Sequence, residues 1–214
     1  MKSTMKSIVF AASLVCASGV AFAADKSSWG PGADDAAFQA MLKSGFREKG
    51  IAKLTRLDQD ATQAFCSDPQ LVASKDGAAI AAKIEAENMK TVKWPSDGVW
   101  LGSHAAGEAL AQSGRGLTST DTAETPNGGN CYNCHQISKQ EISYGTIGPS
   151  LYNYGKNRGN GEDALRYAWA KIYNAKASNA CSNMPRAGHM GIINEKQIKD
   201  LMALLFDPAS PVNQ

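Results

Sequence analysis

The sequence predicts an all-α protein, and three observations lead to this fold class. Apolar residues recur at helical spacings across residues 34–89. A second amphipathic segment follows at residues 162–174. A third begins after Asn194, where Asn194 and Gln197 have the spacing of a capping box. Taken in order, these segments predict an N-terminal helical extension followed by a second helical domain.

The extension covers residues 24–98 and is predicted to hold two helical stretches, with Pro69 near the start of the second. Their apolar positions are Ala36, Ala37, Met41, Ile51, Leu54, Leu57, Phe65, Ile80, Ile84 and Met89. No cluster of Cys, His or carboxylate residues in this region would hold a second cofactor. We therefore interpret the extension as a segment that packs on another part of the molecule. Pro95 and Gly98 interrupt helices and place its end at residue 98.

The second domain covers residues 99–214 and is predicted to contain three helices. The first occupies residues 105–112 and ends before Gly114 and Gly116. The second occupies residues 162–174, and the last lies between Asn194 and Pro208. The apolar stripes of the last two helices are Leu165, Trp169, Ile172 and Tyr173, and Ile198, Leu201, Met202 and Leu205.

Residues 1–23 are predicted to be a signal peptide. Lys2 and Lys6 precede an apolar stretch, and Ala21-Phe22-Ala23 fits the small-x-small pattern that signal peptidase cleaves. The apolar stretch is shorter than the roughly 20 residues of a membrane-spanning helix. A retained anchor is the alternative, and lipid attachment at Cys16 is disfavoured by the bulky Val15. We expect export to the periplasm and no membrane span.

The charge of the chain does not point to nucleic acid. The 22 basic residues exceed the 20 acidic ones by two, and the predicted signal peptide contains two of the basic residues. The mature chain, about 190 residues long, is therefore nearly neutral and lacks the basic excess of a nucleic-acid-binding protein.

The chemistry of the chain is concentrated in Cys131-Tyr132-Asn133-Cys134-His135. Two cysteines at this spacing reach the two vinyl groups of one porphyrin, and the next histidine then lies under the ring as an iron ligand. A zinc site would need a second Cys or His pair, and a thioredoxin-like motif would need a βαβ context. The pattern therefore predicts one haem c attached through Cys131 and Cys134, with His135 as an axial ligand.

The second axial ligand is predicted to be Met184. It precedes the last helix in an irregular segment, and Pro185 keeps its backbone away from the helical region. A His/Met pair fills both axial positions and raises the reduction potential, which favours electron transfer over peroxide or oxygen chemistry. The alternatives are the neighbouring His189 and Met190; Met202, on an apolar stripe, is assigned to the core.

Two further expectations support this site. The carbonyl of Pro149 can accept the Nδ1–H of His135 and fix its tautomer, although a plain turn is an alternative for this segment. Cys66 and Cys181 form an even pair in an exported chain, so we expect a disulfide, with two separate buried thiols as the alternative.

The order of these motifs resembles class I cytochromes c: the Cys-x-x-Cys-His run, then Gly148-Pro149, then Met184 before a C-terminal helix. The resemblance covers about the last half of the chain. It implies a class I cytochrome c fold, in which the first and last helices of the domain cross beside the haem.

A narrower resemblance, to the SoxX family, extends over most of the mature chain. It is carried by the phrases Trp94-Pro95-Ser96-Asp97-Gly98, Gln112-Ser113-Gly114-Arg115-Gly116, Asn127-Gly128-Gly129-Asn130-Cys131, Gly145-Thr146-Ile147-Gly148-Pro149-Ser150-Leu151, Met184-Pro185-Arg186 and Asp207-Pro208-Ala209-Ser210-Pro211-Val212-Asn213. SoxX proteins are the monohaem subunits of SoxAX, the cytochrome of bacterial thiosulfate oxidation.

This resemblance implies a non-catalytic subunit of a heterodimer with L-cysteine S-thiosulfotransferase activity. The SoxA partner would carry the catalytic haem, at which thiosulfate is joined to a cysteine of the carrier protein SoxY. This chain would accept the released electrons and pass them to a small soluble cytochrome c. The alternatives are a free-standing electron shuttle and, less favoured, a haem enzyme or sensor.

Overall fold

A computed structural model of the chain describes residues 36–214. The predicted signal peptide, residues 1–23, and Cys16 lie outside the described residues. Residues 42–214 form one compact unit. Helix α1 (Ala36–Gly45) begins before this unit and is described only by itself. The described part of the chain consists of helices and loops, with an isolated β-bridge between Lys49 and Ala52. This confirms the all-α class, and none of the described helices is long and apolar enough to cross a membrane.

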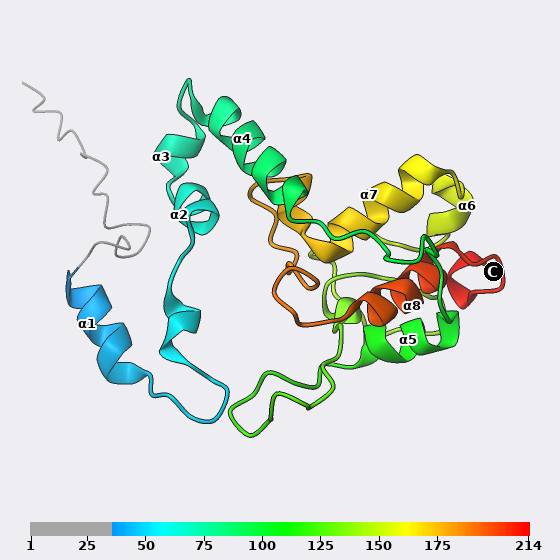
Figure 1. The fold of residues 1–214 in the computed structure, drawn as a ribbon, viewed down its shortest axis with the longest axis horizontal. Helices are drawn as coiled ribbons and strands as arrows, with labels where there is room; N and C mark the ends of the chain where they lie inside the picture. Colours follow the sequence, from blue (N-terminus) through cyan, green and yellow to red (C-terminus); the bar gives the residue numbers. More distant parts are fainter. Residues whose placement is uncertain (1–35) are drawn as a thin grey trace, which may run out of the picture. The chain divides into compact units, whose positions relative to one another are not determined.

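The centre of the compact unit is the contact between α5 (His104–Gln112) and α8 (Glu195–Phe206), which lie side by side in Figure 1. The capping box predicted at Asn194 and Gln197 is confirmed at the start of α8. Gly107 makes the close approach possible, because a Cβ at this position would overlap the backbone carbonyl of Asp200. The two helices therefore meet backbone to backbone, as expected of the first and last helices of a cytochrome c domain.

Four more helical elements of the compact unit, one of them long, follow α5 and surround α8 in the sequence. They are α6 (Tyr154–Arg158), α7 (Glu162–Tyr173), the 3₁₀ helix η4 (Ala175–Ala177) and the 3₁₀ helix η5 (Pro211–Asn213). Trp169 of α7 and Met202 and Phe206 of α8 are fully buried in one hydrophobic core. Met202 thus has the packing role that its position on the apolar stripe predicts.

The extension contributes η2 (Leu54–Leu57), α2 (Ala61–Ser67), α3 (Pro69–Val72) and α4 (Gly77–Lys90). The helical stretch predicted to start near Pro69 is divided into α3 and α4 by a turn that precedes Gly77. A Cβ at Gly77 would overlap the carbonyl of Val72, so this turn requires glycine. Helix α4 then packs along η4 (Figure 1).

One buried amide joins α4 to the rest of the unit. Asn174, between α7 and η4, is fully buried. Its Nδ2 donates to Asn88 Oδ1 at 2.9 Å and to Thr91 Oγ1 at 3.0 Å. Its Oδ1 accepts from the backbone N–H of Lys176. Because a buried polar group is costly unless it is hydrogen-bonded, these bonds fix the position of α4.

The segment predicted to end the extension packs against the same core. The rings of Trp94 and Trp100 meet edge to face, as do those of Trp100 and Trp169. The indole N–H of Trp169 donates to the Lys93 carbonyl at 2.8 Å. Asp97 pairs with Lys199 of α8 at 2.7 Å. The boundary predicted after residue 98 thus falls inside the compact unit.

Candidate functional site

The five-residue motif forms a short 3₁₀ turn, η3 (Cys131–Asn133), followed by Cys134 and His135. Asn130, just before it, has a left-handed backbone with φ 52°. The backbone N–H groups of Cys134 and His135 both donate to the Cys131 carbonyl, at 3.1 and 3.0 Å. Neither thiol is in a disulfide, and both are partly accessible. Burial raises the pKa of the Cys131 thiol to about 11, so this group is neutral at pH 7.

A second segment, residues 145–151, runs along the motif and holds it by backbone hydrogen bonds. The N–H of Gly145 donates to the Tyr132 carbonyl, and the N–H of Gly148 donates to the Cys134 carbonyl, both at 2.8 Å. The N–H of Leu151 donates to the Gln136 carbonyl at the same distance. We call residues 131–151 the haem loop.

The imidazole of His135 is fixed by this loop. Its Nδ1 lies 2.7 Å from the carbonyl oxygen of Pro149, which confirms the predicted contact. A carbonyl oxygen only accepts hydrogen bonds, so Nδ1 carries the proton and Nε2 is left with a free lone pair. Gly148 lies against the ring, and a Cβ there would overlap the imidazole.

A polar network supports the motif from the inside, and the sequence analysis did not anticipate it. The hydroxyl of Tyr132 is 2.7 Å from Glu108 Oε1 on α5 and 2.8 Å from Ser138 Oγ. Burial and the nearby Glu108 carboxylate together raise the pKa of Tyr132 to about 12, while the hydrogen bonds with Ser138 oppose this shift. Tyr132 therefore stays protonated. A tyrosine between two cysteines gives no local pattern that predicts a carboxylate partner on a preceding helix.

Met184 lies in residues 178–194, which connect η4 to α8 and which we call the methionine loop. Its side chain is partly buried and packs on the hydrophobic core, as Cys131 also does. The alternative ligands His189 and Met190 are exposed, Met190 with 60% of its surface accessible. The backbone N–H of His189 donates to the Tyr173 carbonyl at 2.9 Å, which ties the second half of this loop to α7.

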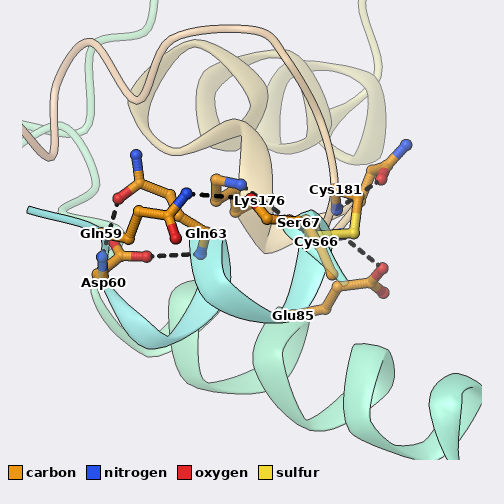
Figure 2. Close-up of a disulfide and its surroundings, with 10 residues drawn as sticks. Gln59, Asp60, Gln63, Cys66, Ser67, Glu85, Lys176 and Cys181 are labelled. Atoms are coloured by element: carbon orange, nitrogen blue, oxygen red, sulfur yellow. Dashed lines mark hydrogen bonds between the residues drawn. A yellow bond between two sulfur atoms is a disulfide. The ribbon is translucent and has the colours of Figure 1, made fainter. Parts of the chain in front are cut away.

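The first half of the methionine loop is attached to the extension. Cys66 of α2 and Cys181 are joined in a disulfide, with a Cα–Cα distance of 5.4 Å and a sequence separation of 115 residues (Figure 2). Arg186 forms an ion pair with Asp60 at 2.6 Å. Burial opposes ionisation of Asp60, but the N–H of Gln63 and the Arg186 guanidinium outweigh it and lower the pKa of Asp60 below its usual value. Sequence reasoning predicted the disulfide but not the ion pair.

These residues fit a covalently attached haem. Two free thiols are separated by two residues in the chain, and the next histidine has Nδ1 committed to a carbonyl and Nε2 available for iron. Together with the α5–α8 pair, they define the class of the protein as a c-type cytochrome.

The comparisons with known proteins give the family. Residues 103–206 match the family model described as Cytochrome c. Over 159 residues the chain is 36% identical to a protein of Aquifex aeolicus (strain VF5) named "Uncharacterized lipoprotein", with 73% of each chain covered. Residues 103–206 therefore form a cytochrome c domain, and proteins of this family bind haem c covalently and transfer electrons.

Proposed function

We propose that this chain is the monohaem electron-transfer subunit of a periplasmic SoxAX-type cytochrome. Its SoxA partner carries out thiosulfate transfer to the SoxY carrier cysteine, and this chain passes the released electrons to a small soluble cytochrome c. The six phrases that resemble SoxX support this proposal, since they extend beyond residues 103–206 in both directions. Export is supported by the name of the Aquifex aeolicus relative, because lipoproteins are exported proteins.

In this proposal one haem c is attached to Cys131 and Cys134, and the iron is ligated by His135 and Met184. The observation that carries this assignment is the hydrogen bond from His135 Nδ1 to Pro149, which leaves Nε2 free to bind iron next to two free thiols in the sequence. The haem, when bound, would supply a one-electron redox change. The chain supplies the attachment, the orientation of the imidazole and the methionine sulfur. No residue of this chain makes or breaks substrate bonds.

A partner surface is supported by exposed apolar residues in the haem loop. Ile142 and Ile147 have 88% and 79% of their surfaces accessible, and Tyr144 is also exposed. They flank Gly145, whose N–H is bonded to the haem motif. Apolar side chains gathered in one exposed loop are typical of a protein interface rather than of free solvent contact. We place the SoxA or acceptor contact here.

Substitution of Met184 tests the ligand assignment. The ferric holoprotein is expected to show the weak red charge-transfer band of methionine–iron ligation, and Met184→Ala is expected to abolish it. The reduction potential is expected to fall, because methionine favours the reduced iron. Met190→Ala is the matched control, since Met190 lies in the same loop but is exposed. A band that survives Met184→Ala would remove Met184 from the site.

Purification tests the partner assignment. A SoxAX subunit is expected to co-purify with a second cytochrome from cells that express both genes. Ile142→Ser together with Ile147→Ser is expected to weaken this association while leaving the haem spectrum unchanged. A chain that runs as a lone monomer beside its co-expressed partner would instead favour a free-standing shuttle.

A further inference from the structure

The methionine loop is attached to the extension on both sides of Met184. Cys181, three residues before Met184, is bonded to Cys66. Arg186, two residues after Met184, is paired with Asp60. The Arg186 side chain is only 12% exposed, so its charge is largely removed from water and depends on this partner.

Both attachments come from one short helix. Asp60 is the N-cap of α2, where its side chain accepts the Gln63 N–H at 2.8 Å within a complete capping box. Cys66 lies near the other end of the same helix, as Figure 2 shows. Phe65, next to Cys66 in this helix, is also buried. The ion pair and the disulfide therefore act from a single rigid element.

A third contact fixes the residue just before Cys181. The N–H of Ala180 donates to Glu85 Oε1 of α4 at 3.0 Å. Its carbonyl accepts from Lys176 Nζ, also at 3.0 Å. Helix α4 is in turn bonded to the core through Asn88 and Asn174. The extension thus links the hydrophobic core to the segment that carries Met184.

A loop ligand leaves a metal when the loop can open locally, and the population of the open state depends on how firmly the loop is held. Pro185 restricts the backbone at Met184 but makes no bond to the rest of the fold. In the described structure, the backbone N–H of Met184 donates one hydrogen bond, to Oγ of the nearby Ser182. Besides the packing of Met184 on the hydrophobic core, the long-range covalent and polar contacts of residues 180–186 therefore come from α2 and α4.

We propose that α2 is a clamp that keeps Met184 in place as the axial ligand, with Cys66, Cys181, Asp60 and Arg186 as its positioning residues. The proposal rests on the assignment of Met184 given under the proposed function. In this role the extension stabilises the closed iron site, in addition to any contact with a partner.

Imidazole binding to the ferric full-length holoprotein measures the open population, because imidazole takes the position that Met184 vacates. The apparent affinity for such a ligand is proportional to the fraction of molecules in the binding-competent state. Cys66→Ser with Cys181→Ser is expected to raise the apparent imidazole affinity by about tenfold or more, within the range of measured couplings between sites. Asp60→Asn, tested separately, is expected to raise it by about three- to fivefold, because a partly exposed ion pair holds the loop less strongly than a covalent bond. The red charge-transfer band is expected to be lost at correspondingly lower imidazole concentrations.

Asp68→Asn is the matched control. Asp68 is the N-cap of α3 and accepts from Gln70 and Leu71, but it has no ion pair with the methionine loop. Asparagine is as good an N-cap as aspartate, so both substitutions preserve the helices and remove only a charge. Asp60→Asn therefore keeps the test available where the cysteine variant fails to fold.

The outcomes separate the clamp from the ligand assignment. If imidazole affinity in both Asp60→Asn and the cysteine variant stays within about twofold of the wild type, well under the usual coupling, the clamp is refuted. A wild-type protein without the methionine band would refute the ligand assignment instead. Equal increases in Asp60→Asn and Asp68→Asn would also refute the clamp, because they would reflect a general loss of stability.

Discussion

The haem loop and the methionine loop carry the two proposed iron ligands, and they are held in different ways. In the haem loop most partners are close in sequence: Gly148 bonds to Cys134, and His135 to Pro149, while the more distant Glu108 is 24 residues from its partner Tyr132. In the methionine loop the attachments around Met184 come from α2 and α4, through Cys66, Asp60 and Glu85, more than 90 residues earlier. The histidine side of the site is therefore held mainly by local contacts, and the methionine side is held by long-range contacts.

This difference predicts where the site is most easily loosened. Contacts between residues distant in sequence need a large loop to close before they form, whereas the haem loop can form from its own backbone. Loss of the extension should therefore release the methionine side and leave the histidine side ordered.

The largest effect is expected from removal of the disulfide. Cys66→Ser with Cys181→Ser is expected to lower the free energy of unfolding by about 4 kcal/mol, because the bond closes a loop of 115 residues in the unfolded chain. Denaturant unfolding of the holoprotein measures this change. Hydrogen exchange should show faster exchange in residues 180–186 and little change in the haem loop. Equal loss of protection in both loops would contradict the division between them.

Much of the locally built side could be predicted from the sequence. Cys131, Cys134 and His135 form a contiguous motif, and Pro149 follows at a distance that a short loop can close. The capping box at Asn194 and Gln197 is likewise a local pattern. Each of these features depends on residues that are near one another in the chain, so spacing alone carries the information.

On the methionine side of the site, a long-range contact could be predicted only where chemistry restricts the choice of partner. Cys66 and Cys181 could be paired because few cysteines remained. Asp60 and Arg186 could not, because charged residues are numerous and each has many possible partners. The contacts of Asn174 with α4 were missed for the same reason, since a lone asparagine gives no sign that it will be fully buried. Helical periodicity predicts a buried face but not the element that covers it.

An intermediate effect is expected at Gly148 in the haem loop. Gly148→Ala places a methyl group where the His135 imidazole lies, and is expected to cost about 3 kcal/mol through overpacking. The ring must shift, so the hydrogen bond to Pro149 is weakened and the haem spectrum is expected to change. Imidazole affinity at the methionine side is expected to rise less than in the disulfide variant.

Gly161→Ala is the control for this substitution. A Cβ at Gly161 meets nothing within 4 Å, and the residue has φ −67°, which alanine adopts without strain. Its effect on the free energy of unfolding is expected to be below about 0.5 kcal/mol, as for other surface changes. If Gly148→Ala were equally mild, the close contact between residue 148 and His135 would not be important for the site.

The smallest effect is expected from the Asp60–Arg186 ion pair, and it depends on pH. The pKa of Asp60 is lowered in the folded protein, so ionised Asp60 stabilises the fold above the unfolded pKa of about 4, and this contribution is lost as the pH falls through the folded pKa. Asp60→Asn is expected to destabilise the protein by under about 1 kcal/mol at pH 7, because the Asp60 side chain is 41% exposed and partly screened by water. Unfolding measured for both proteins across acidic pH should show this difference disappear as the pH falls through the folded pKa of Asp60, where the aspartate itself becomes neutral. A difference that stays constant below that pKa would show that the charge of Asp60 does not hold the methionine loop, and the disulfide would then be the main long-range attachment of this side of the site.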